Sequence, residues 1–242
     1  MRLTLVRNAT ILVELAGRRI LVEPMLDPAG TRPPVEDSPS PRPNPLAPLP
    51  LPAEEIVAGL DAVIVTHLHR DHFDDTGARL VPRDVPVFCQ PEDEERLRSF
   101  GLDARPIDRE LSWEGLRIAR TGGRHGSDEA TVAALGPVSG FVLDGLYIAG
   151  DTVWCAEVEE AIERHRPRVA VVNGSGAHFR HSGPLVMTAE QIREVVERVP
   201  TVVVVHLEAI DHCLETRREV RAAVPEALVP EDGETLELAL DQ

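Results

Sequence analysis

The segment THLHRDH, residues 66–72, places three histidines and one aspartate within seven positions. Imidazole is the commonest protein ligand for zinc-like metals, and His67 and His69 can both face one point where a turn leaves a strand. Asp71 and His72 follow at once and could serve a second point close by. Because one ion rarely takes four ligands from one turn, the spacing favours two adjacent ions, which in hydrolytic sites lie roughly 3.5–4 Å apart.

Three residues of the same chemistry occur later in the chain. His125 lies in the loop GRHGS, Asp151 follows LYIAG, and His206 follows TVVVV. Read alone, each has a structural explanation: a loop histidine, a helix N-cap and a buried core histidine, respectively. These patterns alone do not connect the three residues with residues 66–72.

HxHxDH directly after the apolar run DAVIV resembles the metallo-β-lactamase superfamily. GRHGS, IAGDT and VVVVHLEAIDHC follow in that family's order, and NATILVELAGRRILVEPM is similar to its first strands. The resemblance covers nearly the whole chain. It implies an α+β fold, the four-layer αβ/βα sandwich with a two-metal site along one edge of the two sheets. It also implies one metallo-β-lactamase-like domain over residues 1–242.

Carried over residue by residue, the resemblance implies seven metal ligands. The first ion would take His67, His69 and His125, the second would take Asp71, His72 and His206, and Asp151 would bridge both. A hydroxide activated by the two ions would attack a carbonyl or phosphoryl centre, since bound cations lower the pKa of water toward about 7. Asp71 and Asp151 would be the catalytic carboxylates. The ligand set suits zinc and manganese first, and also iron and nickel.

Three longer motifs indicate one branch of the superfamily. NATILVEL, NGSGAHFRHSGPLVMTAEQI and VVVVHLEAIDHC resemble the L-ascorbate-6-phosphate lactonase-like hydrolases. The resemblance implies a metal-dependent hydrolase for a small anionic ester or lactone, such as a sugar-phosphate lactone. Asn8, where the family often has histidine, and the proline-rich residues 24–52 depart from that branch and leave the substrate open.

Two alternatives to a lactonase remain. A phosphodiesterase could use the same dinuclear site, and a non-catalytic metal-binding or sensing module could keep the ligands without turnover. The complete ligand set argues against the second alternative, because loss of catalysis usually removes a ligand. Four residues near the site are candidates for binding the substrate: His178, Arg180, His181 and His212.

The balance of charge limits the partners. With 41 acidic and 25 basic residues, the chain has a formal net charge of -16, which disfavours nucleic acid and anionic lipid. The N-terminus MRLTLVRNATILVEL lacks a signal-peptide pattern, and no apolar run approaches the roughly 20 residues that span a bilayer. We therefore expect a cytoplasmic enzyme for a small molecule, with free thiols at its three cysteines. Homo-oligomerisation stays open.

Short apolar strands and amphipathic helices must position these residues. Strands are predicted at residues 2–6, 10–15, 19–23, 61–65, 85–89, 104–107, 116–120, 131–136, 140–145, 146–150, 168–172, 201–205 and 234–240. Helices are predicted at residues 53–60, 73–81, 91–100, 156–166, 188–199 and 214–224. Residues 24–52 are too rich in proline for either, and their length is typical of lids and binding loops.

Overall fold

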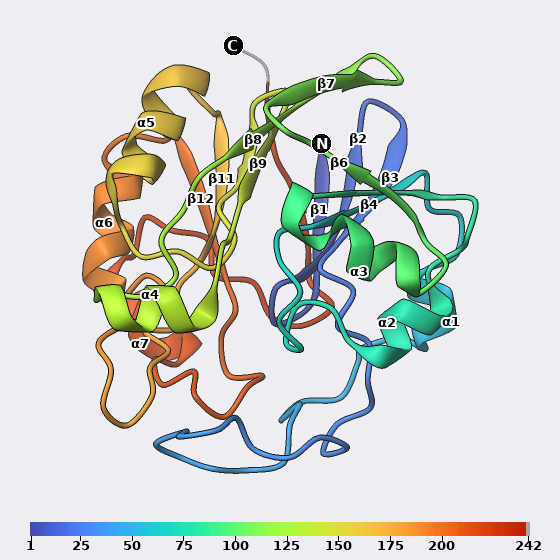
Figure 1. Cartoon of the computed structure of the whole chain (residues 1–242). Coiled ribbons are helices and arrows are strands. Elements are labelled where there is room, and N and C mark those ends of the chain that lie inside the picture. Colours follow the sequence, from blue (N-terminus) through green and yellow to red (C-terminus); the bar gives the residue numbers. More distant parts are fainter. Residues whose placement is uncertain (241–242) are drawn as a thin grey trace.

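Two β-sheets lie face to face in the computed structural model, which describes residues 1–240 (Figure 1). The strands of the first sheet are β1 (Arg2–Arg7), β2 (Thr10–Leu15), β3 (Arg18–Val22), β4 (Ala62–Val65), β5 (Pro86–Cys89), β6 (Asp103–Pro106) and β13 (Thr235–Glu237). The strands of the second sheet are β7 (Glu110–Trp113), β8 (Leu116–Thr121), β9 (Gly140–Leu143), β10 (Leu146–Ile148), β11 (Val169–Asn173) and β12 (Thr201–Val205). The strand orders are β13-β1-β2-β3-β4-β5-β6 and β12-β11-β10-β9-β8-β7.

Helices cover the outer faces of both sheets (Figure 1). The first sheet is covered by α1 (Ala53–Ile56), α2 (Asp75–Leu80) and α3 (Glu94–Ser99), with a 3-10 turn at Pro91–Asp93 before α3. The second sheet is covered by α5 (Ala156–His165), α6 (Ala189–Val196) and α7 (Arg217–Ala223). One apolar core lies between the sheets and one lies beneath each helical layer. The predicted four-layer α+β sandwich is confirmed.

The directions of the strands bring several loops to one edge. β10, β11 and β12 pair in parallel, while β8 and β10 both pair antiparallel with β9. The carboxyl ends of β8, β10, β11 and β12 therefore reach the same edge of the second sheet. In the facing sheet β4 pairs in parallel with β3 and β5, and its carboxyl end leads into residues 66–72. Ligand sites commonly form at such carboxyl ends.

The predicted strand at residues 131–136 is wrong, because residues 131–135 belong to helix α4, Glu129–Leu135, and Gly136 follows its end. The side chain of Asp128 begins the helix by accepting a hydrogen bond from the N–H of Thr131. The β-branched Thr131 and Val132 favour a strand, but the N-cap and the following alanines outweigh them. Strand β7 lies outside the predicted strands. It is a short, half-exposed edge strand that pairs with β8, so its apolar signal is weak.

Residues 24–52 form no helix or strand, as their prolines predict. We call them the proline-rich segment. Within it, one isolated bridge joins Arg32 to Asn44. All three cysteines are free, as expected. Across residues 1–240, no helix combines the length and the apolar character needed to cross a membrane.

Candidate metal centre

The seven predicted ligands come together between the two sheets. The turn after β4 carries His67, His69, Asp71 and His72, while His125 follows β8, Asp151 follows β10 and His206 follows β12. Four of these residues therefore belong to the first sheet's half of the molecule and three belong to the second. The centre joins the two halves of the sandwich.

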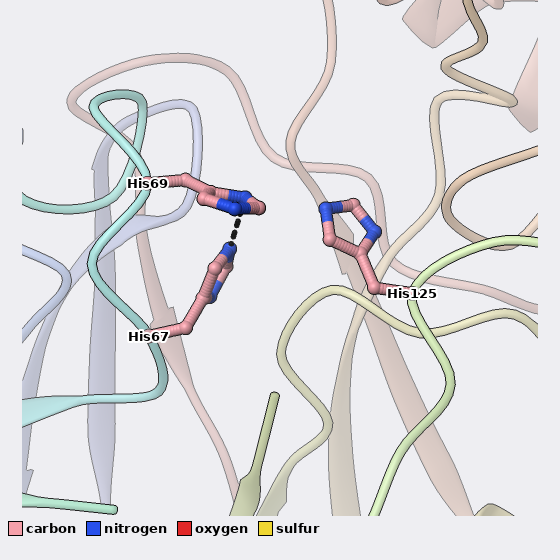
Figure 2. Close-up of side chains that lie close together, drawn as sticks. All are labelled: His67, His69 and His125. Carbon is pink, nitrogen blue, oxygen red and sulfur yellow. Dashed lines mark hydrogen bonds between the residues drawn. The ribbon is translucent and has the colours of Figure 1, made fainter. Parts of the chain in front are cut away.

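One cluster consists of His67, His69 and His125. Figure 2 shows the rings of His67 and His69 on one segment, facing His125 on the segment opposite. His67 Nε2 lies 3.0 Å from His69 Nδ1, and the ring centroids of His69 and His125 are 5.2 Å apart. Each residue offers one nitrogen, and these nitrogens lie within 4.8 Å of one another. Nitrogens this close can share one cation, since zinc–nitrogen bonds are roughly 2.0–2.1 Å long.

A second cluster consists of Asp71, His72, Asp151 and His206, whose ligand atoms also lie within 4.8 Å of one another. His72 Nε2 is 3.1 Å from Asp151 Oδ2, and His206 Nε2 is 3.3 Å from Asp71 Oδ2. Asp151 Oδ2 also lies 3.5 Å from His125 Nε2 in the first cluster. Asp151 therefore stands between the clusters, where its carboxylate could contact a cation on either side.

Contacts with other protein groups fix the ring orientation of four histidines. Their Nδ1 atoms lie close to these partners: His67 to Thr66 Oγ1 at 2.9 Å, His72 to Glu23 Oε2 at 2.9 Å, His125 to the Leu185 carbonyl at 3.0 Å, and His206 to Cys213 Sγ at 3.3 Å. Each contact engages Nδ1, so that Nε2 faces the centre, and it thereby determines which ring nitrogen carries the proton. His69 is the reverse case, because its Nε2 lies 3.1 Å from the Leu135 carbonyl and its Nδ1 faces His67.

Two of the inward nitrogens have no hydrogen-bond partner within residues 1–240. They are Nε2 of His72 and Nε2 of His206, both buried, although carboxylate oxygens lie 3.1 and 3.3 Å away. A buried polar nitrogen without a partner costs free energy unless a ligand takes that place. Imidazole nitrogens and carboxylate oxygens are ligands for divalent metals, so such cations fit this donor set.

Burial sets the charge of the first cluster. Burial, with His72 and His69 nearby, holds the pKa of His67 well below its usual value. Burial also lowers the pKa of His69 and of His125, against the opposing effect of neighbouring carboxylates. The three rings are therefore neutral at pH 7, which is the form of imidazole that binds metals.

The second cluster concentrates negative charge. Burial would raise the pKa of Asp151 and Asp71, but His72 and its neighbours outweigh burial and hold both pKa values well below their usual range. Burial opposes a charged ring at His72, yet Asp151, Asp71 and Glu23 raise the pKa of His72 to about 10. The buried carboxylates thus favour positive charge at this centre, whether it is carried by protons or by metal ions.

Glu23 belongs to this centre and was missed by the sequence analysis. Its buried side chain follows β3, and Oε1 accepts a hydrogen bond of 2.7 Å from the N–H of Thr66. Its other oxygen, Oε2, contacts Nδ1 of His72. The signal in the sequence is a glutamate between an apolar strand and Pro24. That signal is weak, because polar residues commonly follow strands.

Two asparagines hold the aspartates in place. Asn173 Nδ2 donates to Asp151 Oδ1 at 2.6 Å, which orients the carboxylate between the clusters. Asn8 Nδ2 donates to the backbone carbonyl of Asp71 at 2.9 Å, and the carbonyl of Asn8 accepts from the N–H of His206 at 2.9 Å. Asn8 therefore connects the turn after β4 to the turn after β12.

A cavity of about 380 Å³ opens onto the centre. Four of the seven predicted ligands line it: His69, Asp71, His125 and Asp151. The other three do not line it and are buried: His67, His72 and His206. Most of the remaining wall is apolar and includes Met25, Pro33, Pro34, Val35, Leu135, Phe179, Leu185 and Ile210.

Of the four candidate substrate-binding residues, His212 lines the cavity and the other three do not. Arg180 instead binds backbone carbonyl oxygens of the proline-rich segment. His178 contacts a carbonyl of its own loop, and His181 is exposed. The residue of this loop that does line the cavity is Phe179.

Comparison with known proteins identifies relatives along almost the whole chain. Residues 18–207 match the family model described as a Beta-lactamase superfamily domain. UPF0173 protein YddR of Bacillus subtilis is 37% identical, over 97% of this chain and 99% of that protein. A UPF0173 metal-dependent hydrolase of Methanocaldococcus jannaschii is 27% identical, over 81% of this chain and 90% of that protein. The crystal structure of isothiocyanate hydrolase from Delia radicum gut bacteria has a TM-score of 0.92 and 35% identity, covering 98% of this chain and 99% of that chain.

The matched region contains all seven predicted ligands, from His67 to His206. Two of these relatives are named as hydrolases, and their similarity is not confined to the segment around the histidines. The chain therefore belongs to the metallo-β-lactamase superfamily and, within it, to the UPF0173 family of metal-dependent hydrolases.

Proposed function

We propose that this hydrolase binds two divalent cations and acts on a small, largely apolar electrophile of the isothiocyanate class. The observation that carries the substrate class is the cavity, whose wall is mostly apolar apart from the carboxylates and imidazoles of the two clusters. Its volume, about 380 Å³, suits a small molecule. The isothiocyanate hydrolase from Delia radicum gut bacteria, 35% identical over nearly the full length, supports the same class.

The two clusters support the number of cations. In this proposal His67, His69 and His125 would hold the first cation and Asp71, His72 and His206 the second, with Asp151 available to either. Bound cations of this kind lower the pKa of a water toward about 7 and stabilise developing negative charge. Zinc and manganese are the first candidates, and iron and nickel also suit these ligands.

Asp71 is the residue best placed to move a proton. Its side chain lines the cavity and is 15% exposed, and its pKa lies well below the usual range, so it is an anion at neutral pH. The oxygen of water would attack the central carbon of R–N=C=S, while Asp71 accepts a proton and returns it to nitrogen. This step gives the thiocarbamic acid R–NH–C(=S)–OH, which still carries the second water proton on oxygen. That proton then moves to nitrogen as the C–N bond breaks, releasing the amine and carbonyl sulfide. The overall balance is RNCS + H2O → RNH2 + COS.

A small anionic ester or lactone, such as a sugar-phosphate lactone, is the second candidate. One observation favours it: Arg70 lines the cavity and its side chain is exposed. The other arginine of the wall, Arg32, is paired with Asp27. The membership in the L-ascorbate-6-phosphate lactonase-like branch stays a prediction. A phosphodiester would find few polar partners on this wall, and a non-catalytic module is disfavoured because the relatives are hydrolases.

A substrate panel tests the proposal. Protein reconstituted with zinc or manganese is assayed with allyl isothiocyanate, 6-phosphogluconolactone and bis-(p-nitrophenyl) phosphate. We expect turnover of the isothiocyanate, and we expect Asp151→Asn to lower it by about two to three orders of magnitude. Asp84→Asn, which removes an exposed carboxylate elsewhere, is the control and should leave activity unchanged. Turnover of the lactone or the diester alone would refute the isothiocyanate class.

A further inference from the structure

The proline-rich segment forms one wall of the cavity. Pro33, Pro34 and Val35 line it, together with Asn44 and Pro45. In Figure 1 this segment, drawn in blue, runs beneath both halves of the molecule. The position of the segment relative to the metal centre therefore sets the width of the cavity.

The proline-rich segment has little internal support. It has no helix or strand, its prolines lack an N–H donor, and its one bridge joins Arg32 to Asn44. Buried Arg7 holds its two ends by donating to the carbonyls of Met25, Asp27 and Ala47. The stretch between these ends, residues 28–46, needs other contacts to keep one conformation.

Asp211, in the loop after β12, is fully buried and supplies several of these contacts. Arg180 adds two more, to the carbonyls of Asp37 and Ser38. Oδ1 accepts hydrogen bonds from the N–H of Val35 at 3.3 Å and from Asn44 Nδ2 at 2.8 Å. Oδ2 accepts from the N–H of Arg42 at 3.2 Å. The N–H of Asp211 donates to Asn44 Oδ1 at 3.0 Å, and its carbonyl accepts from Ser38 Oγ at 3.1 Å. One residue thus binds four positions of the segment.

The neighbours of Asp211 line the opposite side of the cavity. Ile210 and His212 both belong to its wall, so Asp211 connects that wall to the proline-rich wall. A carboxylate suits this role, because its two oxygens accept several hydrogen bonds and its charge strengthens them. Its side chain does not line the cavity, so it has no direct route to the reacting atoms.

We propose that Asp211 is a specificity-determining positioning residue. By holding residues 33–35 at a fixed distance from the loop after β12, it sets the width of the cavity and thereby selects substrates by size. The effect on substrate choice rests on the proposed function. The hold on the proline-rich segment does not, and it can be measured separately.

Asp211→Asn tests the proposal. Asparagine has nearly the same shape as aspartate, but an NH2 group replaces one of the two oxygens and cannot accept a hydrogen bond from the N–H groups that face it. We expect hydrogen exchange, followed by mass spectrometry, to accelerate about tenfold or more at the amides of Val35 and Arg42. We expect KM for allyl isothiocyanate to rise about tenfold, with kcat within about twofold of wild type. The ratio of kcat/KM for 2-phenylethyl over allyl isothiocyanate should also rise, because a wider cavity admits the larger group.

Asp37→Asn is the matched control. It makes the same chemical change in the same segment, at an exposed side chain, and should alter neither exchange nor selectivity. Ser38→Ala, which removes one contact to the Asp211 carbonyl, is a milder variant for use if Asp211→Asn does not fold. It should shift exchange and KM in the same direction by a smaller factor.

Two results would overturn the proposal. One is a folded Asp211→Asn protein with unchanged exchange or an unchanged ratio between the two substrates. The other is a loss of kcat that follows a loss of bound metal, which would make Asp211 part of the support of the metal centre. If wild type hydrolyses no isothiocyanate, the proposed function fails, and the Kd of phenylthiourea replaces KM as the measure of the cavity. An unchanged Kd in Asp211→Asn would then overturn the proposal.

Discussion

Glu23 shows how much the centre depends on residues outside the seven predicted ligands, and with His67 and His72 it forms a third group whose ligand atoms lie within 4.8 Å of one another. Its two oxygens each accept one hydrogen bond, from the N–H of Thr66 and from Nδ1 of His72. The first bond ties Glu23 to the residue that precedes His67, and the second turns Nε2 of His72 toward the centre. Partners of this kind are nearly as important to metal affinity as the ligands they orient.

Replacing Glu23 by glutamine should weaken metal binding while preserving the fold. An amide has one acceptor oxygen, so its NH2 group would face either Thr66 N–H or the ring of His72. We expect the affinity of the weaker cation site to fall about 10- to 100-fold, measured by calorimetric titration of metal-free protein. Glu55→Gln, at an exposed glutamate, is the control. Equal affinities in the two variants would remove Glu23 from the centre.

At the scale of elements, the end of β10 approaches the end of β4 closely. Gly150 has a φ of 68°, and a Cβ at this position would lie 2.8 Å from the carbonyl oxygen of Ser139 and 3.1 Å from Thr66 Cβ. Gly150 directly precedes Asp151, and Thr66 directly precedes His67. Because Gly150 has no side chain, the two sheets can approach each other at the centre. Gly145 has a φ of 92°, but a Cβ there would meet nothing closer than 3.8 Å.

Gly150→Ala and Gly145→Ala should therefore differ, although both put alanine in a left-handed conformation. We expect Gly145→Ala to lower the free energy of unfolding by about 1 kcal/mol through backbone strain alone. Gly150→Ala should lower it by roughly 1–3 kcal/mol more, because the added methyl group overpacks the contact between the sheets. Urea unfolding of the metal-free proteins measures both. Equal losses in the two variants would argue against a close approach at Gly150.

A carboxylate at the start of α3 makes stability depend on pH. Burial raises the pKa of Asp93 to about 6, although the hydrogen bond from Gln90 lowers it. The unfolded value is about 3.9, so the folded state binds this proton more tightly. The contribution of Asp93 to stability is therefore fully present below about pH 3.9 and is lost as pH rises through about 6.

Asp93→Asn should abolish this dependence. At pH 8 the free energy of unfolding of the variant should exceed that of wild type by about 1 kcal/mol. This difference is smaller than the full pKa shift would give, because solvent partly screens the Asp93 carboxylate. At pH 4.5 the difference should be much smaller. Urea unfolding of both proteins at the two pH values gives the comparison, with Asp84→Asn as an exposed control. A difference that is the same at both pH values would contradict the raised pKa.

At the scale of the whole molecule, the centre lies between two sheets whose strands do not pair with each other. Ligand candidates come from both halves, so bound cations would connect them. The carboxylates of Asp71, which lines the cavity, and of buried Asp151 would otherwise depend on protonated histidines for compensation. Cation binding should therefore stabilise the whole sandwich against unfolding.

Removing metal with a chelator should lower Tm. At a metal concentration 100 times Kd, one bound ion raises the free energy of unfolding by about 2.7 kcal/mol. For a chain of this length that corresponds to a rise in Tm of roughly 5–10 °C. His206→Ala should bind about one ion instead of two and should show a smaller metal-dependent rise in Tm. His181→Ala, at an exposed histidine, should keep both ions and the full rise in Tm. Metal analysis with calorimetry checks this, and an identical Tm with and without metal would refute it.

Four of the seven candidate ligands could be predicted from the sequence alone because they lie on one turn. The apolar runs before His67 and His206, and the run LYIAG before Asp151, predict strands, and the ends of strands in such a fold meet at one edge. The histidines of residues 66–72 are close in space because they are close in the chain. The sandwich and the grouping of the seven residues into two clusters followed instead from the resemblance to the metallo-β-lactamase superfamily, which rests on these motifs and their order in the chain.

The tertiary structure alone decided the surroundings of the centre. Glu23 accepts a hydrogen bond from Thr66, 43 positions away in the chain, and Asp211 accepts one from Val35, 176 positions away. No periodicity in the sequence predicts such contacts. The segment 131–136 became a helix because an N-cap outweighed β-branched residues, and the carbonyl of Leu135 then reached His69. The apolar wall likewise combines side chains from distant loops. Only the packing of those loops turns a predicted metal centre into a cavity that can select a substrate.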